Sequence, residues 1–199
     1  MSMPSEYMDP YVYPGTNVLK NRAEIRELEL LARFEMDMTT RRAVELMARP
    51  PQQGRFDIPH LQTIHRYIFQ DVYDWAGEIR TVNIARPGQF FFAFVEQIRP
   101  MLNQLFQALK SEKFLKGLNA GQFSKRAGHY MGELNANHPF RDGNGRTQRE
   151  FIRQLASHNG YAAHWSCITR EDMGAASKLS FQKADSSGLA ALILTSITN

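Results

Sequence analysis

The stretch NHPFRDGNGRTQREF, residues 137–151, gathers a histidine, an aspartate, two glycines around an asparagine, and two arginines three positions apart, Arg146 and Arg149. It lies between two segments whose apolar residues recur at helical spacing, residues 121–136 and 147–158. Gly143 and Gly145 tolerate positive φ angles, so successive backbone N–H groups can point toward one spot. Because the first N–H groups of the following helix also lack intrahelical partners, the stretch predicts a phosphate-binding loop between two helices.

The side chains of this loop suit a magnesium nucleotide. Asn144 would add a side-chain amide, while Arg146 and Arg149 would leave one helix face and grip phosphate oxygens. Asp142 is a hard oxygen ligand, and phosphate-bound Mg²⁺ commonly uses one or two carboxylates plus the phosphates themselves. His138 is the candidate general base, because a histidine can accept a proton near neutral pH. Each feature alone has a plainer interpretation: a Gly-Asn-Gly turn is often a connector, and a His-Pro pair can simply end a helix.

The rest of the chain is predicted to be mostly helical, with one β signal. Helix-forming or periodic apolar patterns cover residues 21–48, 61–75, 98–117, 121–136, 147–158, 169–184 and 187–197. Between two of them, EIRTVNI alternates, ARPGQ suits a turn and FFFAF follows, which predicts a β-hairpin over residues 80–95. His65 and Phe140 are interpreted as core residues rather than ligands. We therefore expect one all-α domain, residues 1–199, with a β-hairpin.

Composition narrows the function classes. A chain of 199 residues, 43% hydrophobic and 22% charged, can bury a core without staples. Its one cysteine, Cys167, cannot form an internal disulfide, and the first residues do not have the pattern of a signal peptide, so a cytoplasmic location is expected. No apolar run reaches the ~18–20 residues of a membrane span. The net charge of +4 comes from Lys and Arg interspersed with acids, so direct nucleic-acid binding is not expected.

The run HPFRDGNGRTQR matches every defining position of the Fic motif, and the chain also resembles this family in DVYDWAGEIRTVNI, residues 71–84. The resemblance implies the Fic fold, a helical bundle with a β-hairpin flap beside the motif loop, residues 138–149. It implies that AMP is transferred from ATP to a hydroxyl of a target protein, with His138 as the catalytic base and Asp142 holding Mg²⁺. By the same resemblance the nucleotide phosphates would be bound by Gly143, Asn144, Gly145, Arg146 and Arg149.

In the family, the hairpin is a flap whose edge pairs with the target segment that carries the hydroxyl, a form of β-strand addition. The resemblance assigns this docking role to Val82, Asn83, Ile84, Gln89, Phe90 and Phe91. The alternative is a hairpin that only packs on the helices, and FFFAF is expected to contribute some core residues in either case.

Regulation can also be compared with the family. Many Fic proteins carry an inhibitory helix with a glutamate followed by Gly or Asn, and no glutamate of this chain has such a neighbour. The chain therefore resembles toxins of bacterial toxin–antitoxin pairs, which implies a small helical antitoxin that supplies the glutamate, with DNA gyrase and topoisomerase IV as targets. Phosphate or UMP transfer and a non-catalytic nucleotide-binding module remain alternatives. Gly145 favours AMP transfer, because Doc-type kinases have lysine there, and the intact His138 argues against the module.

Overall fold

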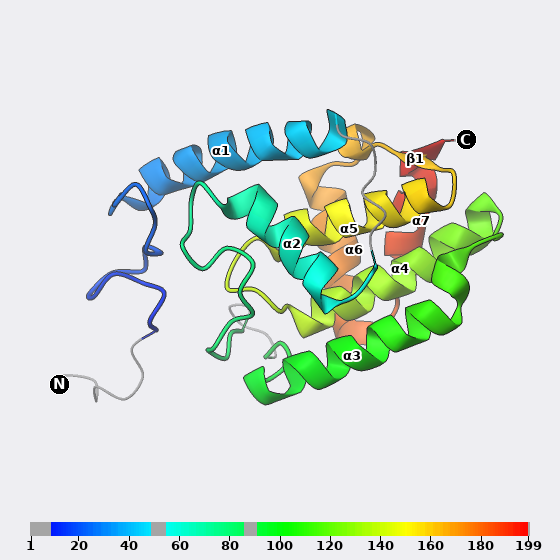
Figure 1. The fold of residues 1–199 in the computed structure, drawn as a ribbon, viewed down its shortest axis with the longest axis horizontal. Coiled ribbons are helices and arrows are strands. Elements are labelled where there is room, and N and C mark those ends of the chain that lie inside the picture. The colour runs from blue at the N-terminus through cyan, green and yellow to red at the C-terminus, as the bar shows by residue number, and fades with distance from the viewer. Residues whose placement is uncertain (1–8, 49–54, 86–90, 199) are drawn as a thin grey trace.

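The computed structural model describes residues 9–48, 55–85 and 91–198. Its helices are α1 (Leu28–Ala48), α2 (Ile58–Phe69), α3 (Val95–Ser111), α4 (Ala120–Asn137), α5 (Asn144–His158), α6 (Arg170–Lys183) and α7 (Ser187–Ser196). Two short strands, β1 (Ala162–Ala163) and β2 (Ile197–Thr198), pair antiparallel. In Figure 1, α1 and α3 lie along opposite sides of the molecule, with α2, α5 and α4 between them. The expected all-α architecture is confirmed.

Helix α4 lies at the centre of the packing and contacts α3, α5, α6 and α7. It begins with a capping box in which Asn119 and Gln122 satisfy each other's backbone N–H groups. Gly128 lets α7 approach closely, since a Cβ there would lie 2.7 Å from the backbone nitrogen of Ala190. The motif loop therefore leaves from the C-terminal end of this central helix.

Most predicted helices are present, with boundaries moved by local backbone geometry. The first begins at Leu28 rather than at residue 21, and α2 ends at Phe69, so that Val72 and Trp75 pack from the turns that follow it. The helix expected over residues 98–117 stops at Ser111, because residues 113–115 all have positive φ angles and form a separate 3₁₀ turn. The β1–β2 pair has no sequence signal, because each strand has two residues.

The hairpin is described at both of its legs. Ala85 and Phe91 form an antiparallel bridge, and the Phe92 N–H donates to the Ile84 carbonyl at 3.2 Å. Residues 86–90, which include the predicted docking residues Gln89 and Phe90, lie outside the described part of the chain. Within the described residues, no helix combines the length and apolar content needed to span a membrane.

Candidate active site

The motif loop connects the end of α4 to the start of α5. His138 terminates α4 with a left-handed backbone, φ 49° and ψ 60°, and Gly143 precedes α5 with φ 79°. Two adjoining cavities of about 440 and 780 Å³ open over this loop and share His138, Gly145, Arg149 and Arg170 among their lining residues. The loop therefore lies at the junction of two hollows rather than on a flat surface.

Gly143 is required by both conformation and space. Its φ of 79° is unfavourable for a side chain, and a Cβ there would lie 2.3 Å from the ring of Phe69. Gly145 differs from the prediction, because it is helical rather than positive in φ, and a Cβ there would meet only Arg149, at 3.6 Å. Gly145 is thus not needed by the protein's own packing, and it lines both cavities.

Asn144 braces the loop through its side-chain amide. Its Oδ1 accepts from the Phe140 N–H at 2.9 Å and its Nδ2 donates to the Phe140 carbonyl at 2.7 Å. One N–H of this buried amide is thus paired within the loop, and Asn144 also lines the smaller cavity, so its role as a side-chain donor to a ligand stays a prediction. The N-terminus of α5 is also available to an anion, because it has no side-chain cap and its first N–H groups lack intrahelical partners.

His65 supports the loop from α2, as a core histidine. Its ring is fully buried, accepts from the Gly77 N–H at Nδ1 (2.8 Å) and donates from Nε2 to the Asp142 carbonyl (3.0 Å). It also stacks on Phe140, with ring centroids 3.9 Å apart. Burial lowers the pKa of His65 to about 3, so the ring is neutral at physiological pH and its two nitrogens keep these fixed roles.

The two motif arginines have different environments. Arg146 is held by α1, because its guanidinium pairs with Glu35 at 2.6 Å and donates to the Thr39 hydroxyl at 3.0 Å. Arg149 lines both cavities, and no hydrogen bond or ion pair joins its guanidinium to the described residues. Burial and the nearby positive charges of Arg146 and Arg170 lower its pKa. Arg149 is therefore the motif cation without a protein counter-ion in the described structure.

Asp142 is the acid of the smaller cavity. Its Oδ1 accepts from the Gly143 N–H and lies 3.8 Å from Arg146 Nη2. Burial and the charge of Glu35 raise the pKa of Asp142, although about half of its side-chain surface is exposed. Among the described residues there is no cluster of three or more His, Cys, Asp and Glu that could hold a metal by itself. The donor set therefore fits a cation shared between one carboxylate and the phosphates of a ligand.

His138 is oriented for proton transfer. Its Nδ1 lies 3.3 Å from the Asn135 carbonyl, which can only accept, so this contact favours the tautomer with the proton on Nδ1. In that tautomer Nε2 is the nitrogen that can take up a proton. The Phe92 ring, from the second leg of the hairpin, stacks on the imidazole at 3.8 Å between centroids. The hairpin therefore directly fixes the plane of the predicted catalytic ring.

Arg80 joins the hairpin to the motif and was not flagged by the sequence. It is 1% exposed and donates to the carbonyls of His138 at 2.8 Å, Val82 at 2.7 Å and Ala93 at 2.5 Å, with a longer contact of 3.4 Å to Asn137. The backbone of Arg80 bonds to the same region, since its own N–H donates to the Pro139 carbonyl at 2.9 Å. One buried cation thus holds both legs of the hairpin against the end of α4.

The larger cavity lies beside the phosphate cradle and is lined by α4, α5, α6 and the turn before α6. Gln148 is buried in its wall, and its Nε2 has no hydrogen-bond partner among the described residues, which leaves a donor for a ligand. Trp165 lines the same wall and donates to the Arg149 carbonyl at 3.2 Å. The cavity has the size and mixed lining of a small-molecule site.

Comparison with known proteins gives the family. The model of the Fic/DOC family matches residues 55–156. The chain belongs to this family. It is 44% identical over 190 residues to protein adenylyltransferase VbhT of Bartonella schoenbuchensis, covering 96% of this chain but only 39% of VbhT. It is 42% identical over 168 residues to the probable protein adenylyltransferase Fic of Escherichia coli, covering 83% of this chain and 81% of that protein.

Solved Fic structures agree with the fold and with a nucleotide site. BepC of Bartonella tribocorum, with bound AMPPNP, has a TM-score of 0.88 and 30% identity over 94% of this chain and 96% of its own. The N-terminal Fic domain of a putative cell filamentation protein from Bartonella quintana, with bound ADP, has a TM-score of 0.88 and 32% identity over 94% of each chain. The Fic fold expected from the motif is therefore confirmed.

Proposed function

We propose that this Fic protein transfers AMP from ATP to a hydroxyl side chain of another protein and releases pyrophosphate. The observation that carries the proposal is the position of His138 at the junction of the two cavities, with Nδ1 facing a carbonyl and Nε2 able to accept a proton. The proposal is supported by relatives named protein adenylyltransferases and by related structures with bound AMPPNP and ADP.

In this proposal, the adenosine occupies the larger cavity, where Gln148 offers a donor to the base, and the phosphates extend over the start of α5. His138 Nε2 accepts the proton of the target hydroxyl, whose oxygen attacks the α-phosphorus while the bond to the pyrophosphate oxygen breaks. The N–H groups of α5 and the guanidinium of Arg149 stabilise the charge that develops on the phosphates. Arg146, already paired with Glu35, contributes from a fixed position.

Asp142 is proposed to hold Mg²⁺, which supplies positive charge beside the phosphates when bound. This assignment is supported by the carboxylate's place in the smaller cavity next to the N-terminus of α5. The hairpin is proposed to dock the target. Ile84 and Ala85 line the smaller cavity and Phe91 is 58% exposed, so the hairpin lies beside the phosphates with apolar surface available.

The test of the reaction uses ATP labelled at either the α- or the γ-phosphate, with Mg²⁺ and bacterial lysate. We expect a labelled protein band only from α-labelled ATP, and none with His138→Ala, which should still bind ATP. Label from the γ-position alone would identify a kinase, and equal labelling by His138→Ala would remove His138 as the base. An Arg149→Ala variant should bind ATP at least about tenfold more weakly by calorimetry, because it loses the cation without a protein counter-ion.

At a finer level, we propose that the protein is a cytoplasmic toxin that modifies DNA gyrase and topoisomerase IV, held inactive by a small helical antitoxin. The lack of a carboxylate partner for Arg149 among the described residues supports an inhibitor that supplies one. Purified gyrase and topoisomerase IV should become labelled from α-labelled ATP, and a candidate antitoxin should compete with ATP. If neither enzyme is labelled while another lysate protein is, the target assignment is wrong.

A further inference from the structure

A separate cleft, of about 700 Å³, lies between the start of α2 and helix α3, and none of its lining residues lines the two cavities of the candidate active site. His158, the last residue of α5, lies at one end of it, whereas the phosphate cradle is at the first residue of the same helix. At 1.5 Å per residue the two sites are separated by roughly 20 Å along α5. The cleft is therefore distinct from the nucleotide site.

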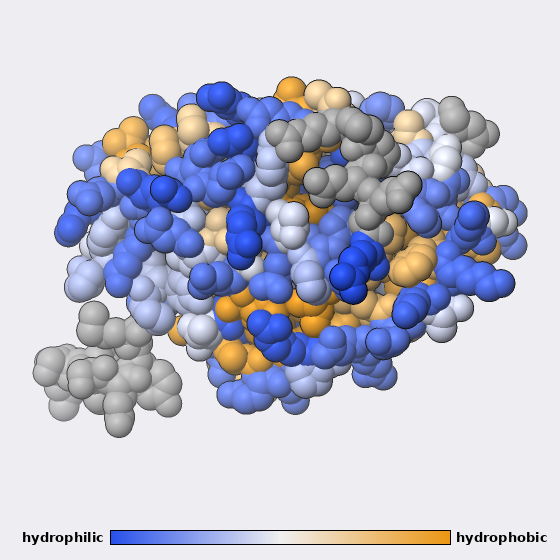
Figure 2. All heavy atoms as spheres, in the orientation of Figure 1, coloured by the Kyte–Doolittle hydropathy of each residue, from blue (hydrophilic) through white to orange (hydrophobic). Residues whose placement is uncertain are grey.

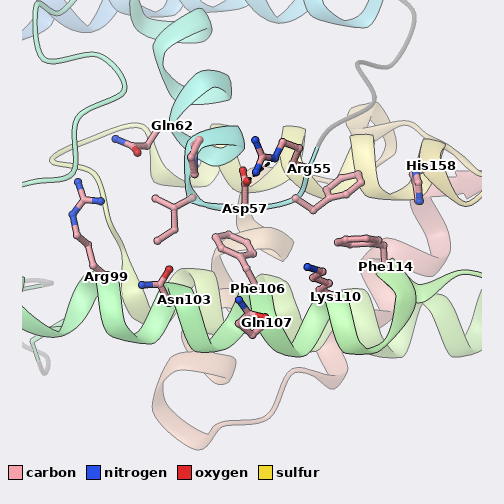
Figure 3. Close-up of a pocket in the computed structure, with 13 residues that line it drawn as sticks. Arg55, Asp57, Gln62, Arg99, Asn103, Phe106, Gln107, Lys110, Phe114 and His158 are labelled. Carbon is pink, nitrogen blue, oxygen red and sulfur yellow. Dashed lines mark ion pairs between the residues drawn. The ribbon is translucent and has the colours of Figure 1, made fainter.

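The floor of this cleft is apolar. Phe56, Ile58 and Phe106 line it while being less than a tenth exposed, and Phe114 closes one end. Figure 3 shows Phe106 extending from α3 toward α2, between the two walls. Figure 2 shows apolar surface between hydrophilic side chains on this face of the molecule. An apolar floor between two helices suits the apolar face of an inserted element.

The rim of the cleft is basic. Four residues are exposed along α3 at a spacing that places them in one row: Arg99, Asn103, Gln107 and Lys110. None of their side chains forms a hydrogen bond or ion pair with the described residues. In Figure 3, Arg99 and Lys110 extend from α3 into the gap. The row spans roughly 16 Å of helix, so it is longer than a small anion needs.

The cleft offers no free negative charge to oppose an acidic ligand. Its one carboxylate, Asp57, caps α2 by accepting from the His60 N–H at 2.9 Å and pairs with Arg55 at 3.2 Å. With Arg55, Arg99 and Lys110 around it, the lining has an excess of positive charge. Charges of one sign around a concave surface favour a partner of the opposite sign.

We propose that this cleft is a docking site for an acidic amphipathic helix of a partner protein. The apolar face of that helix would contact Phe56, Ile58 and Phe106, and its acidic residues would lie beside Arg99 and Lys110. This is the helix-in-groove mode of recognition, in which apolar anchors supply affinity and flanking charges supply selectivity. The elongated row on α3 and the concave apolar floor favour a helix over a compact anion or a flat lipid surface.

The test follows the side-chain amide NMR signals of Asn103 and Gln107 in isotope-labelled protein. The probes are a synthetic helix of about 16 residues with leucines on one face and glutamates beside them, and a twin with lysines in place of the glutamates. The acidic probe should shift both signals saturably, and the basic twin should not. If the acidic probe leaves them unmoved, or both probes bind equally, the proposal is overturned.

Charge reversal provides the second arm. Arg99→Glu combined with Lys110→Glu should weaken the acidic probe at least about tenfold. The control combines Arg33→Glu on α1 with Lys125→Glu on α4, which makes the same change in net charge at two exposed positions away from the cleft and should bind like wild type. Equal loss in both double variants would mean nonspecific attraction. In an Arg149→Ala variant, ATP should not shift the Asn103 and Gln107 amide signals. If it does, the cleft binds small anions, and the proposal of a helix-docking site is refuted. No arm requires AMP transfer.

Discussion

Replacing Arg80 with methionine tests whether one buried cation couples the hairpin to the catalytic motif. The change removes three short hydrogen bonds, to the carbonyls of His138, Val82 and Ala93 at 2.5 to 2.8 Å. Each such bond to a charged donor contributes about 1.5–3 kcal/mol, and part of that sum is offset because the buried charge no longer has to be desolvated. Burial lowers the pKa of Arg80 to about 10, which shows that desolvation disfavours the charged form of this guanidinium. We expect a net loss of about 3 kcal/mol in the free energy of unfolding.

Urea unfolding measures the loss, and Arg22→Met is the matched control. Arg22 is exposed and donates to one carbonyl, that of Gln70, so its replacement should cost less than about 0.5 kcal/mol. Arg80→Lys keeps the charge but cannot span three separate carbonyls with a planar fork, and should recover less than half of the loss.

The same variants should separate catalysis from nucleotide binding. Arg80 lines neither cavity, so ATP affinity by calorimetry should stay near wild type, whereas kcat should fall at least about tenfold because His138 and the hairpin lose their common anchor. An unfolding free energy within about 0.5 kcal/mol of wild type together with an unchanged kcat would refute the coupling.

Other residues give independent tests. Gly143→Ala should cost about 2–4 kcal/mol in urea unfolding, because it combines a positive φ with contact to the Phe69 ring, whereas Gly145→Ala should leave stability within about 0.5 kcal/mol and weaken ATP binding by calorimetry. Because burial raises the pKa of Asp142, the Mg²⁺-dependent affinity for ATP should begin to decline on acidification at a pH above the ordinary pKa of an aspartate. A decline that begins only below that ordinary pKa would contradict a raised pKa of Asp142. Burial lowers the pKa of His65 to about 3, so the contribution of its neutral ring to the free energy of unfolding is complete above about pH 6.5. That contribution is lost as the pH falls toward 3, by up to about 1.4 kcal/mol per pH unit. The free energy of unfolding of His65→Gln, measured in urea, should lack this part of the pH dependence. Identical pH profiles for the variant and the wild type would refute the prediction.

The sequence was sufficient to predict the motif loop and its class of ligand, because those features are local. A phosphate-binding loop is defined within 12 consecutive residues, 138–149, by glycines at fixed positions, an acid beside them and arginines at helical spacing. The helix pattern was equally readable, because apolar periodicity repeats within each segment. His65 could also be assigned to the core from its apolar stripe, and the structure confirms it.

Several site features have no local signal. Glu35 on α1 pairs with Arg146, which lies 111 positions away, and that contact depends on how α1 packs over α2. Gln148 reads from sequence as an ordinary helix residue, and only the cavity beside it shows an available donor. Asn144 and Phe140 are only four positions apart, yet the hydrogen bonds between the Asn144 amide and the Phe140 backbone depend on the turn that the loop adopts.

By itself, the sequence determined the family and the helical class, and it predicted which residues contact phosphate, since each of these follows from residue types at short spacing. Only the tertiary structure decided which of those side chains are available and what holds them. Asn144 bonds to Phe140 and Arg146 pairs with Glu35, whereas Arg149 has no counter-ion among the described residues, and Arg80 anchors the hairpin. The physical reason is that hydrogen bonds and ion pairs between distant segments exist only once the core has brought those segments together, so their partners cannot be read from spacing along the chain.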